Sequence, residues 1–291
     1  METPPPDLSE YDKSVIFDQL DLTLNRMILE SLLHGLYTGI VAVTLWTIFS
    51  STKRLHGTFL RTIIIVLYVL ATISFVIDWV FGHRAFITYG DNYYTVFSAL
   101  MDDGPWWRAC FLIDAITGGG STLLVDVTII WRCWVLWDRQ WRIVFLPIIC
   151  TIAGTAMKIM ETLSVVYSST DDISKIGVFA PQIDWSLIYI VLTLTTTVLC
   201  TVLILYRIGR FAHRLLLFRS IISALIESSA IYTLALVVYL ALVRGNTMSA
   251  AYADIVATYV RAIAPTLLVL RVAARSTPQG SHCRTDTSES V

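Results

Sequence analysis

Charged residues lie inside long apolar segments of this chain, where they are the residues best placed to bind a ligand or to join helices. A charge at bilayer depth costs about 2.5–3.5 kcal/mol even on a lenient insertion scale, so these residues should face other helices and find partners. A helical rise of about 1.5 Å per residue sorts them into two groups at opposite ends. The group on the side of the N-terminus comprises Glu30, Asp78, Asp114, Lys158, Glu161 and Arg261.

Four members of this group are predicted to form a polar pocket: Asp114, Lys158, Glu161 and Arg261. Lys158 and Glu161 are three residues apart and therefore share one helix face. Asp114 and Arg261 lie about 8 Å and about 12 Å below the ends of their helices, which allows contact through long side chains. The pocket would bind a small molecule. The alternative is a set of structural ion pairs, because the two other members lie near helix ends, where side chains reach water cheaply.

The second group lies toward the opposite end and consists of Asp126, Arg132 and Glu227. They lie about 16 Å, 8 Å and 12 Å from that end, respectively. Arg132 can bridge to Glu227 if the third and sixth apolar segments are neighbours. Such a pair is either a switch that breaks when a helix moves or a static polar contact between two helices. The sequence leaves both interpretations open.

The sequence lacks the residue patterns of retinal proteins, metal-dependent enzymes and serine hydrolases. A retinal protein needs a lysine in its seventh span, and segment 253–272 has none. A metal site needs several histidines and carboxylates at one depth, but His34 is the only histidine within an apolar segment. No GxSxG nucleophile motif occurs. The sequence therefore predicts that the protein is not an enzyme and has no metal and no cofactor.

The composition is that of an integral membrane protein. Of the 291 residues, 56% are hydrophobic and 15% are charged, and the mean hydropathy is +0.68. Soluble domains average about 45–50% apolar and about 25% charged residues. The 21 basic and 22 acidic residues give a net charge of −1, which argues against nucleic acid as a partner. The lipid bilayer is the expected partner.

Seven segments are long and apolar enough to cross a membrane, for which about 20 residues are needed. They predict an all-α fold, a polytopic bundle of seven transmembrane helices. The third segment carries Gly118–Gly120, where it can bend or pack closely against a neighbour. The segments are 27–50, 59–81, 109–137, 143–167, 184–208, 219–243 and 253–272.

Basic residues in the connections predict the orientation. Six lie on the side of the N-terminus and thirteen on the other side, and the side richer in Lys and Arg is cytoplasmic. We therefore expect an acidic extracellular tail over 1–26, the bundle over 27–272 and a disordered cytoplasmic tail over 273–291. Segment 86–100, with a turn at Gly90-Asp91-Asn92, is expected to lie on the outer face and to hold one short interfacial helix.

Four motifs carry a resemblance to a known family. They are ESLLHGLYT (30–38), DVTIIWRCWVLW (126–137), IESSAIY (226–232) and APTLLVLR (264–271). Together they resemble a large family of seven-helix membrane proteins of basidiomycete fungi, over nearly the whole bundle. The resemblance implies the architecture and a fungal source, and it implies no reaction or ligand.

The topology is also similar to that of G-protein-coupled receptors, with two departures. The seventh segment has Ala264-Pro265-Thr266 where a rhodopsin-like receptor has an Asn-Pro pair, and loop 168–183 has no cysteine to pair with Cys110. These departures argue against transferring G-protein coupling to this chain.

The function expected from these features is a receptor-like sensor of a small molecule or lipid, because polar groups in both halves suit coupling between an outer site and an inner response. The alternative is a small-molecule transporter or channel, although internal repeats are lacking and the span count is odd. A cytoplasmic protein is a candidate partner at the basic inner loop 207–219. The plasma membrane is expected over internal membranes.

Overall fold

The computed structural model describes residues 9–50, 58–102, 104–168, 185–211, 219–245 and 249–276. Side chains within these ranges are described except at 58–60, 167–168, 208, 211, 219–229 and 272–276.

The described residues are almost entirely helical and include no strand, which confirms the predicted all-α fold. A short π-helical segment, η1 (Arg84–Thr88), continues α2. The α-helices are α1 (Glu10–Ser50), α2 (Thr58–His83), α3 (Tyr93–Leu100), α4 (Pro105–Leu136), α5 (Trp141–Ser168), α6 (Trp185–Phe211), α7 (Arg219–Arg244) and α8 (Ala250–Ser276).

Six of the helices are long and apolar enough to cross a membrane, counted over the described residues. They are α1, α2 with η1, α4, α5, α6 and α8. In α7, side chains are described only from Ala230, and Ala230–Arg244 is a shorter apolar helix. Large apolar side chains such as Leu32, Trp46 and Ile116 are exposed on the outside of the helices, as expected for contact with lipid. The chain is therefore a multi-pass membrane protein.

The long helices form a closed ring in chain order. Each packs against the next, from α1 and α2 through α4, α5, α6 and α7 to α8, and α8 returns to pack against α1. Helix α4 also contacts α6 and α8 across the ring. This arrangement turns polar side chains from separate parts of the sequence toward one interior.

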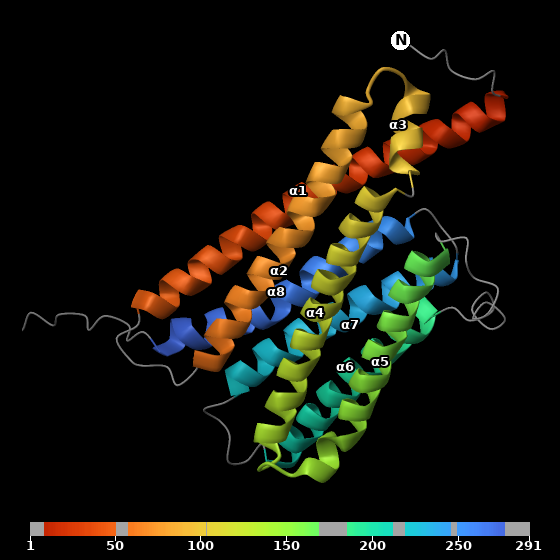
Figure 1. Ribbon diagram of the computed structural model, residues 1–291. Coiled ribbons are helices and arrows are strands. Elements are labelled where there is room, and N and C mark those ends of the chain that lie inside the picture. Colours follow the sequence, from red (N-terminus) through yellow and green to blue (C-terminus); the bar gives the residue numbers. More distant parts are fainter. Residues whose placement is uncertain are drawn as a thin grey trace, which may run out of the picture.

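Helix α1 begins at Glu10, well before the predicted start of the first span at residue 27. The additional turns are helical because their side chains pack against α3. Ile16 is buried, Phe17 stacks on Tyr93 with ring centroids 5.2 Å apart, and Leu20 packs against the small cluster around Val96. In Figure 1 this end of α1 runs past α3, which lies beside it.

The short helix expected within 86–100 is present as α3, and the turn before it includes Gly90–Asn92. Asn92 begins α3 with a capping box: its Oδ1 accepts from the backbone N–H groups of Tyr94 and Thr95, both at 3.0 Å. The Thr95 hydroxyl oxygen accepts from the Asn92 N–H at 3.1 Å. This pairing satisfies amide groups that a helix start otherwise leaves without partners.

The turn between α4 and α5 contains two residues in the left-handed region, Asp138 (φ 50°) and Arg139 (φ 63°). This conformation is unfavourable for residues other than glycine, and specific contacts hold it. Asp138 forms an ion pair with Arg207 of α6, and the Arg139 guanidinium lies 5.6 Å from the ring centroid of Trp134. The turn is thereby fixed to the end of α6.

Candidate functional site

A cavity of about 240 Å³ lies inside the ring and is lined by side chains from all seven of its helices. All four residues predicted to form the polar pocket line this cavity: Asp114, Lys158, Glu161 and Arg261. They come from α4, α5 and α8, which the chain separates widely and the closed ring brings together. We call this space the outer cavity.

The outer cavity is unusually rich in charge for the interior of a helical bundle, and carboxylates exceed cations. Its aromatic lining is three tyrosines, Tyr189, Tyr239 and Tyr259. Five acidic side chains line it: Glu30, Asp78, Asp114, Glu161 and Asp254. Three basic side chains line it: Arg26, Lys158 and Arg261.

Two ion pairs use part of this charge. Lys158 Nζ lies 3.0 Å from Glu161 Oε2, as their spacing of three residues predicts, and Lys158 also lies 5.5 Å from the ring centroid of Tyr189. Arg26 Nη2 lies 3.5 Å from Asp78 Oδ2.

Three carboxylates of the outer cavity remain outside these pairs. Among the described residues, no ion pair joins Glu30, Asp114 or Asp254 to a cation. Glu30 is buried and interacts electrostatically with Asp78 and Asp114 as well as with Arg26, so the carboxylates form one acidic group next to a shared arginine. An acidic group inside a bundle is stabilised by a cation that enters it.

Arg261 lies about 10 Å further along α8 than Asp254. Only 8% of Arg261 is exposed. It donates a hydrogen bond to the Thr122 hydroxyl, and its guanidinium lies 5.9 Å from the ring centroid of Tyr232. It interacts electrostatically with Asp254 on one side and with Asp126 on the other. Arg261 therefore connects the outer cavity with the inner polar group.

The inner group is only partly assembled in the described residues. Asp126 is buried, with 4% of it exposed, and lies apart from the lining of the outer cavity. Arg132 is half-buried. The side chain of Glu227 lies outside the described residues. The main neighbours of α4 are α2, α5, α6 and α8, whereas α7 packs against α6 and α8. The Arg132–Glu227 bridge stays a prediction.

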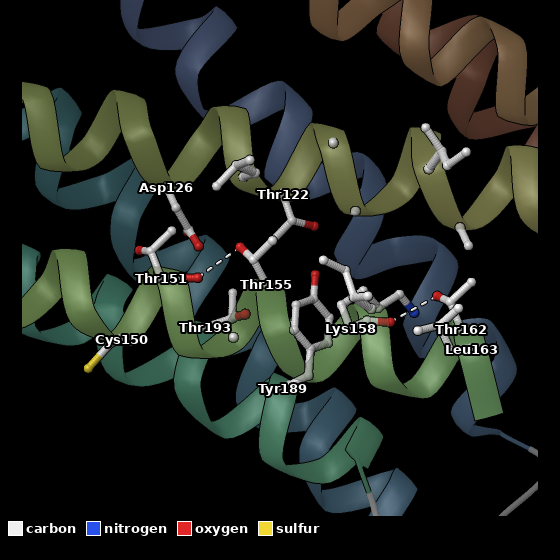
Figure 2. A pocket seen from close by; sticks show the side chains of 17 residues that line it. Thr122, Asp126, Cys150, Thr151, Thr155, Lys158, Thr162, Leu163, Tyr189 and Thr193 are labelled. Atoms are coloured by element: carbon white, nitrogen blue, oxygen red, sulfur yellow. Dashed lines mark hydrogen bonds between the residues drawn. The ribbon is translucent and has the colours of Figure 1, made fainter. Parts of the chain in front are cut away.

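A second space, of about 310 Å³, separates α4 from α5 (Figure 2). We call it the α4–α5 cleft. Asp126 and Thr151 lie on its two walls, and their side chains point into it. It meets the outer cavity where both are lined by the same side chains, Ala115, Thr122, Lys158, Tyr189 and Thr193.

The glycine run Gly118–Gly120 leaves space. Among the described residues, the predicted close helix contact is absent at Gly118 and Gly119, whereas the predicted bend, in a helix that runs from Pro105 to Leu136, stays a prediction. A Cβ atom on Gly118 would meet nothing within 4 Å, and one on Gly119 would come no closer than 3.7 Å to Lys158 Cγ. Gly118 lines the outer cavity, and Gly119 and Gly120 line the cleft.

At the opposite end of the bundle, aromatic contacts join α4 to α6. Trp137 Nε1 donates to the Leu203 carbonyl oxygen at 3.3 Å, and its ring stacks on Tyr206 with centroids 6.2 Å apart. Arg207 lies 5.2 Å from the Trp137 ring centroid and also pairs with Asp138. Any movement of α4 relative to α6 must change these contacts.

His34 belongs to a packed aromatic cluster. It stacks on Phe75 with ring centroids 4.5 Å apart, and its Nδ1 lies 3.4 Å from the Tyr259 hydroxyl. Among the described residues, no group of three or more His, Cys, Asp and Glu side chains is arranged to hold a metal ion.

The pocket predicted from the sequence does not include Asp254 or the tyrosines that line the outer cavity. A signal for Asp254 was present, because it lies seven residues before Arg261 and so on the same face of α8. Tyr189 carried no comparable signal, since a tyrosine in an apolar helix has the same pattern whether it faces lipid or a cavity.

Comparison with known proteins finds no matching family model, no matching curated protein and no matching solved structure. The fold and the site define a multi-pass helical membrane protein with a charged internal cavity.

Proposed function

We propose that this protein is a receptor-like membrane sensor that binds a small cationic molecule in its outer cavity. The observation that carries this proposal is the single cavity that collects five acidic side chains against three basic ones. Ligand sites are generally concave, with a few convergent polar groups. A structural network would need its charges balanced, whereas this one keeps three carboxylates outside the ion pairs of the described residues.

The lining suits an organic ammonium ion in particular. Asp114 and Asp254 supply negative charge for a cation. Tyr189, Tyr239 and Tyr259 supply aromatic faces, which attract organic cations by about 0.5–2 kcal/mol each. A metal ion would instead need several oxygen ligands at fixed short distances.

The response would pass from the outer cavity through Arg261. A cation beside Asp254 weakens the attraction between that carboxylate and Arg261, and so shifts the balance toward Asp126. Because Asp126 lies on α4, whose far end is joined to α6 through Trp137, the helix has a route to the inner surface. Arg261 would then be the movable part shared by two sites, as an allosteric response requires.

The architecture in this proposal is the seven-span bundle, with the N-terminus outside, the C-terminus in the cytoplasm and the plasma membrane as its location. All seven ring helices, α7 included, count as spans. The charge distribution of the connections and the resemblance to seven-helix proteins of basidiomycete fungi support it. The basic connection 207–219 is the surface for a cytoplasmic protein, although most of its side chains lie outside the described residues.

The test uses protein purified into lipid nanodiscs and a matched pair of probes, choline and its uncharged isostere dimethylbutanol. A ligand that binds the folded state raises the melting temperature. We expect choline to raise it in the wild-type protein, dimethylbutanol to leave it unchanged, and Asp114→Asn and Asp254→Asn each to remove the choline effect. Asp21→Asn, an exposed carboxylate outside the cavity, is the matched control and keeps the effect.

Equal shifts with both probes, or a choline shift that survives both cavity variants, would contradict cation binding. Uptake of labelled choline into proteoliposomes, abolished by the same variants, would make the protein a transporter. The sensor proposal predicts binding with no uptake above that of empty liposomes.

A further inference from the structure

The α4–α5 cleft contains buried polar atoms without partners. Among the described residues, no hydrogen-bond partner reaches Asp126 Oδ1 or Thr151 Oγ1, although both atoms are buried. Asp126 is 4% and Thr151 is 8% exposed. Most buried polar atoms in proteins have a partner, and leaving one without is costly. Figure 2 shows the two side chains pointing into the same space from facing helices.

Apart from these atoms the cleft is mainly apolar, and it faces the bilayer. Its rims carry large apolar side chains on the outside of the bundle, with Ile116 69% and Ile159 54% exposed. Other threonines of the lining have already used their hydroxyl hydrogens within the helix: Thr155 donates to the Thr151 carbonyl and Thr162 to the Lys158 carbonyl. In the described part of the chain, the buried atoms of the cleft that lack a hydrogen-bond partner are therefore those of Asp126 and Thr151.

The apolar space continues beyond these two residues. A further pocket of about 340 Å³ between the same two helices shares Leu123 and Thr151 with the cleft and is walled by Trp131, Trp134 and Trp141. An occupant whose polar group lies at Asp126 and Thr151 thus has apolar surface for its body on both sides. At about 310 Å³ the cleft itself lies at the lower end of the range for small-molecule sites.

We propose that the α4–α5 cleft binds a small apolar alcohol that reaches it from the bilayer, with its hydroxyl group between Asp126 and Thr151. A hydroxyl group is both donor and acceptor, so it can donate to the Asp126 carboxyl and accept from the Thr151 hydroxyl at once. An ether can only accept, and a hydrocarbon can do neither. The binding energy comes from the apolar body, and the two hydrogen bonds select the alcohol.

The test uses a decanol analogue with a photoreactive diazirine in its chain, added to the protein in lipid nanodiscs. After irradiation, mass spectrometry locates the label. We expect labelling of the α4 and α5 segments that line the cleft, and competition by excess decanol but not by decyl methyl ether. Thr151→Val removes one hydroxyl at nearly constant shape and should weaken competition by decanol about fivefold to tenfold.

Two variants separate loss of the hydrogen bond from loss of the fold. Thr151→Ser restores the hydroxyl and should restore decanol competition. Thr162→Val makes the same change as Thr151→Val within the same cleft, at a residue whose hydroxyl is already bonded, and should leave it intact.

Three results would overturn the inference: label spread over the lipid-facing sides of all helices, equal competition by decanol and its methyl ether, or full decanol competition in Thr151→Val. The first would show that the probe merely dissolves in lipid, and the others that the polar atoms are satisfied by water. None of these results depends on choline, so this inference and the proposed function can fail separately.

Discussion

Arg261 and Asp126 are two buried charges of opposite sign that interact electrostatically. Arg261 is almost fully buried, holds Thr122 by a hydrogen bond and lies over Tyr232. Asp126 is also buried, and among the described residues its Oδ1 has no hydrogen-bond partner. In a low-dielectric interior such charges stabilise each other even without direct contact. Each buried charge should therefore destabilise the fold less when the other charge is present.

A double-mutant cycle measures this dependence. We expect Arg261→Met to destabilise the protein by about 3–5 kcal/mol, because it leaves Asp126 as a buried charge without compensation. Adding Asp126→Leu should recover most of that loss, since both charges are then gone. Unfolding of the purified protein in a denaturing detergent provides the free energies. Strictly additive single effects would show that the two charges do not interact.

The Lys158–Glu161 pair should behave differently because both side chains are about a quarter to a third exposed, at 30% and 24%. Exposed ion pairs contribute about 0–1 kcal/mol. Glu161→Gln is therefore expected to change stability by no more than about 1 kcal/mol, measured in the same unfolding assay. A loss as large as that expected for Arg261→Met would mean that this pair, too, is a buried structural link.

Among the helices, α3 is the one most dependent on a local signal. It has only eight residues, too few for a helix that is stable alone. Its capping box and the packing of Val96 and Leu100 on Ala85 hold it in place. The extended end of α1 depends in turn on α3, through the stacking of Phe17 on Tyr93.

Removing the cap should loosen α3 selectively. Asn92→Ala deletes the side chain that accepts from two backbone amides and should cost about 1 kcal/mol of local stability. Hydrogen exchange of the amides in 93–100 should become about fivefold faster, the factor that this energy implies. Asp91→Ala, an exposed residue in the preceding turn, is the control and should leave that exchange unchanged. Unaltered exchange in Asn92→Ala would mean that packing alone holds α3.

For the molecule as a whole, the number of spans decides where the termini lie. Seven crossings place the two ends on opposite sides of the membrane, and six place them on the same side. Six helices meet the length and hydropathy of a span over the described residues, and α7 is the seventh member of the ring.

Glycosylation acceptor sites added at each terminus can show whether the number of membrane crossings is odd or even. We expect the N-terminal site to be glycosylated in microsomal membranes and the C-terminal site to remain unmodified. Modification of both ends, or of neither, would require an even number of spans and would remove the orientation on which the outer cavity is named.

Much of this structure could be predicted from the sequence, because lipid imposes strong rules on length and hydropathy. The Lys158–Glu161 pair follows from helical spacing alone, and the depths of Asp114 and Arg261 permit the common cavity that both residues line. The extension of α1 could not be predicted, because its cause is packing on α3, a contact between distant parts of the chain. The space beside Gly118–Gly120 could not be predicted either, since glycines permit a close contact or a cavity equally well.

The proposed sensor function depends most on communication between the outer cavity and the opposite end of α4. Hydrogen exchange of the turn 137–141, followed by mass spectrometry with and without choline, tests this directly in nanodiscs. We predict that choline changes exchange in this turn in the wild-type protein. The change should be absent in Arg261→Met, as judged under conditions where that variant is folded. A change confined to the outer cavity, or one that Arg261→Met preserves, would contradict the proposed coupling.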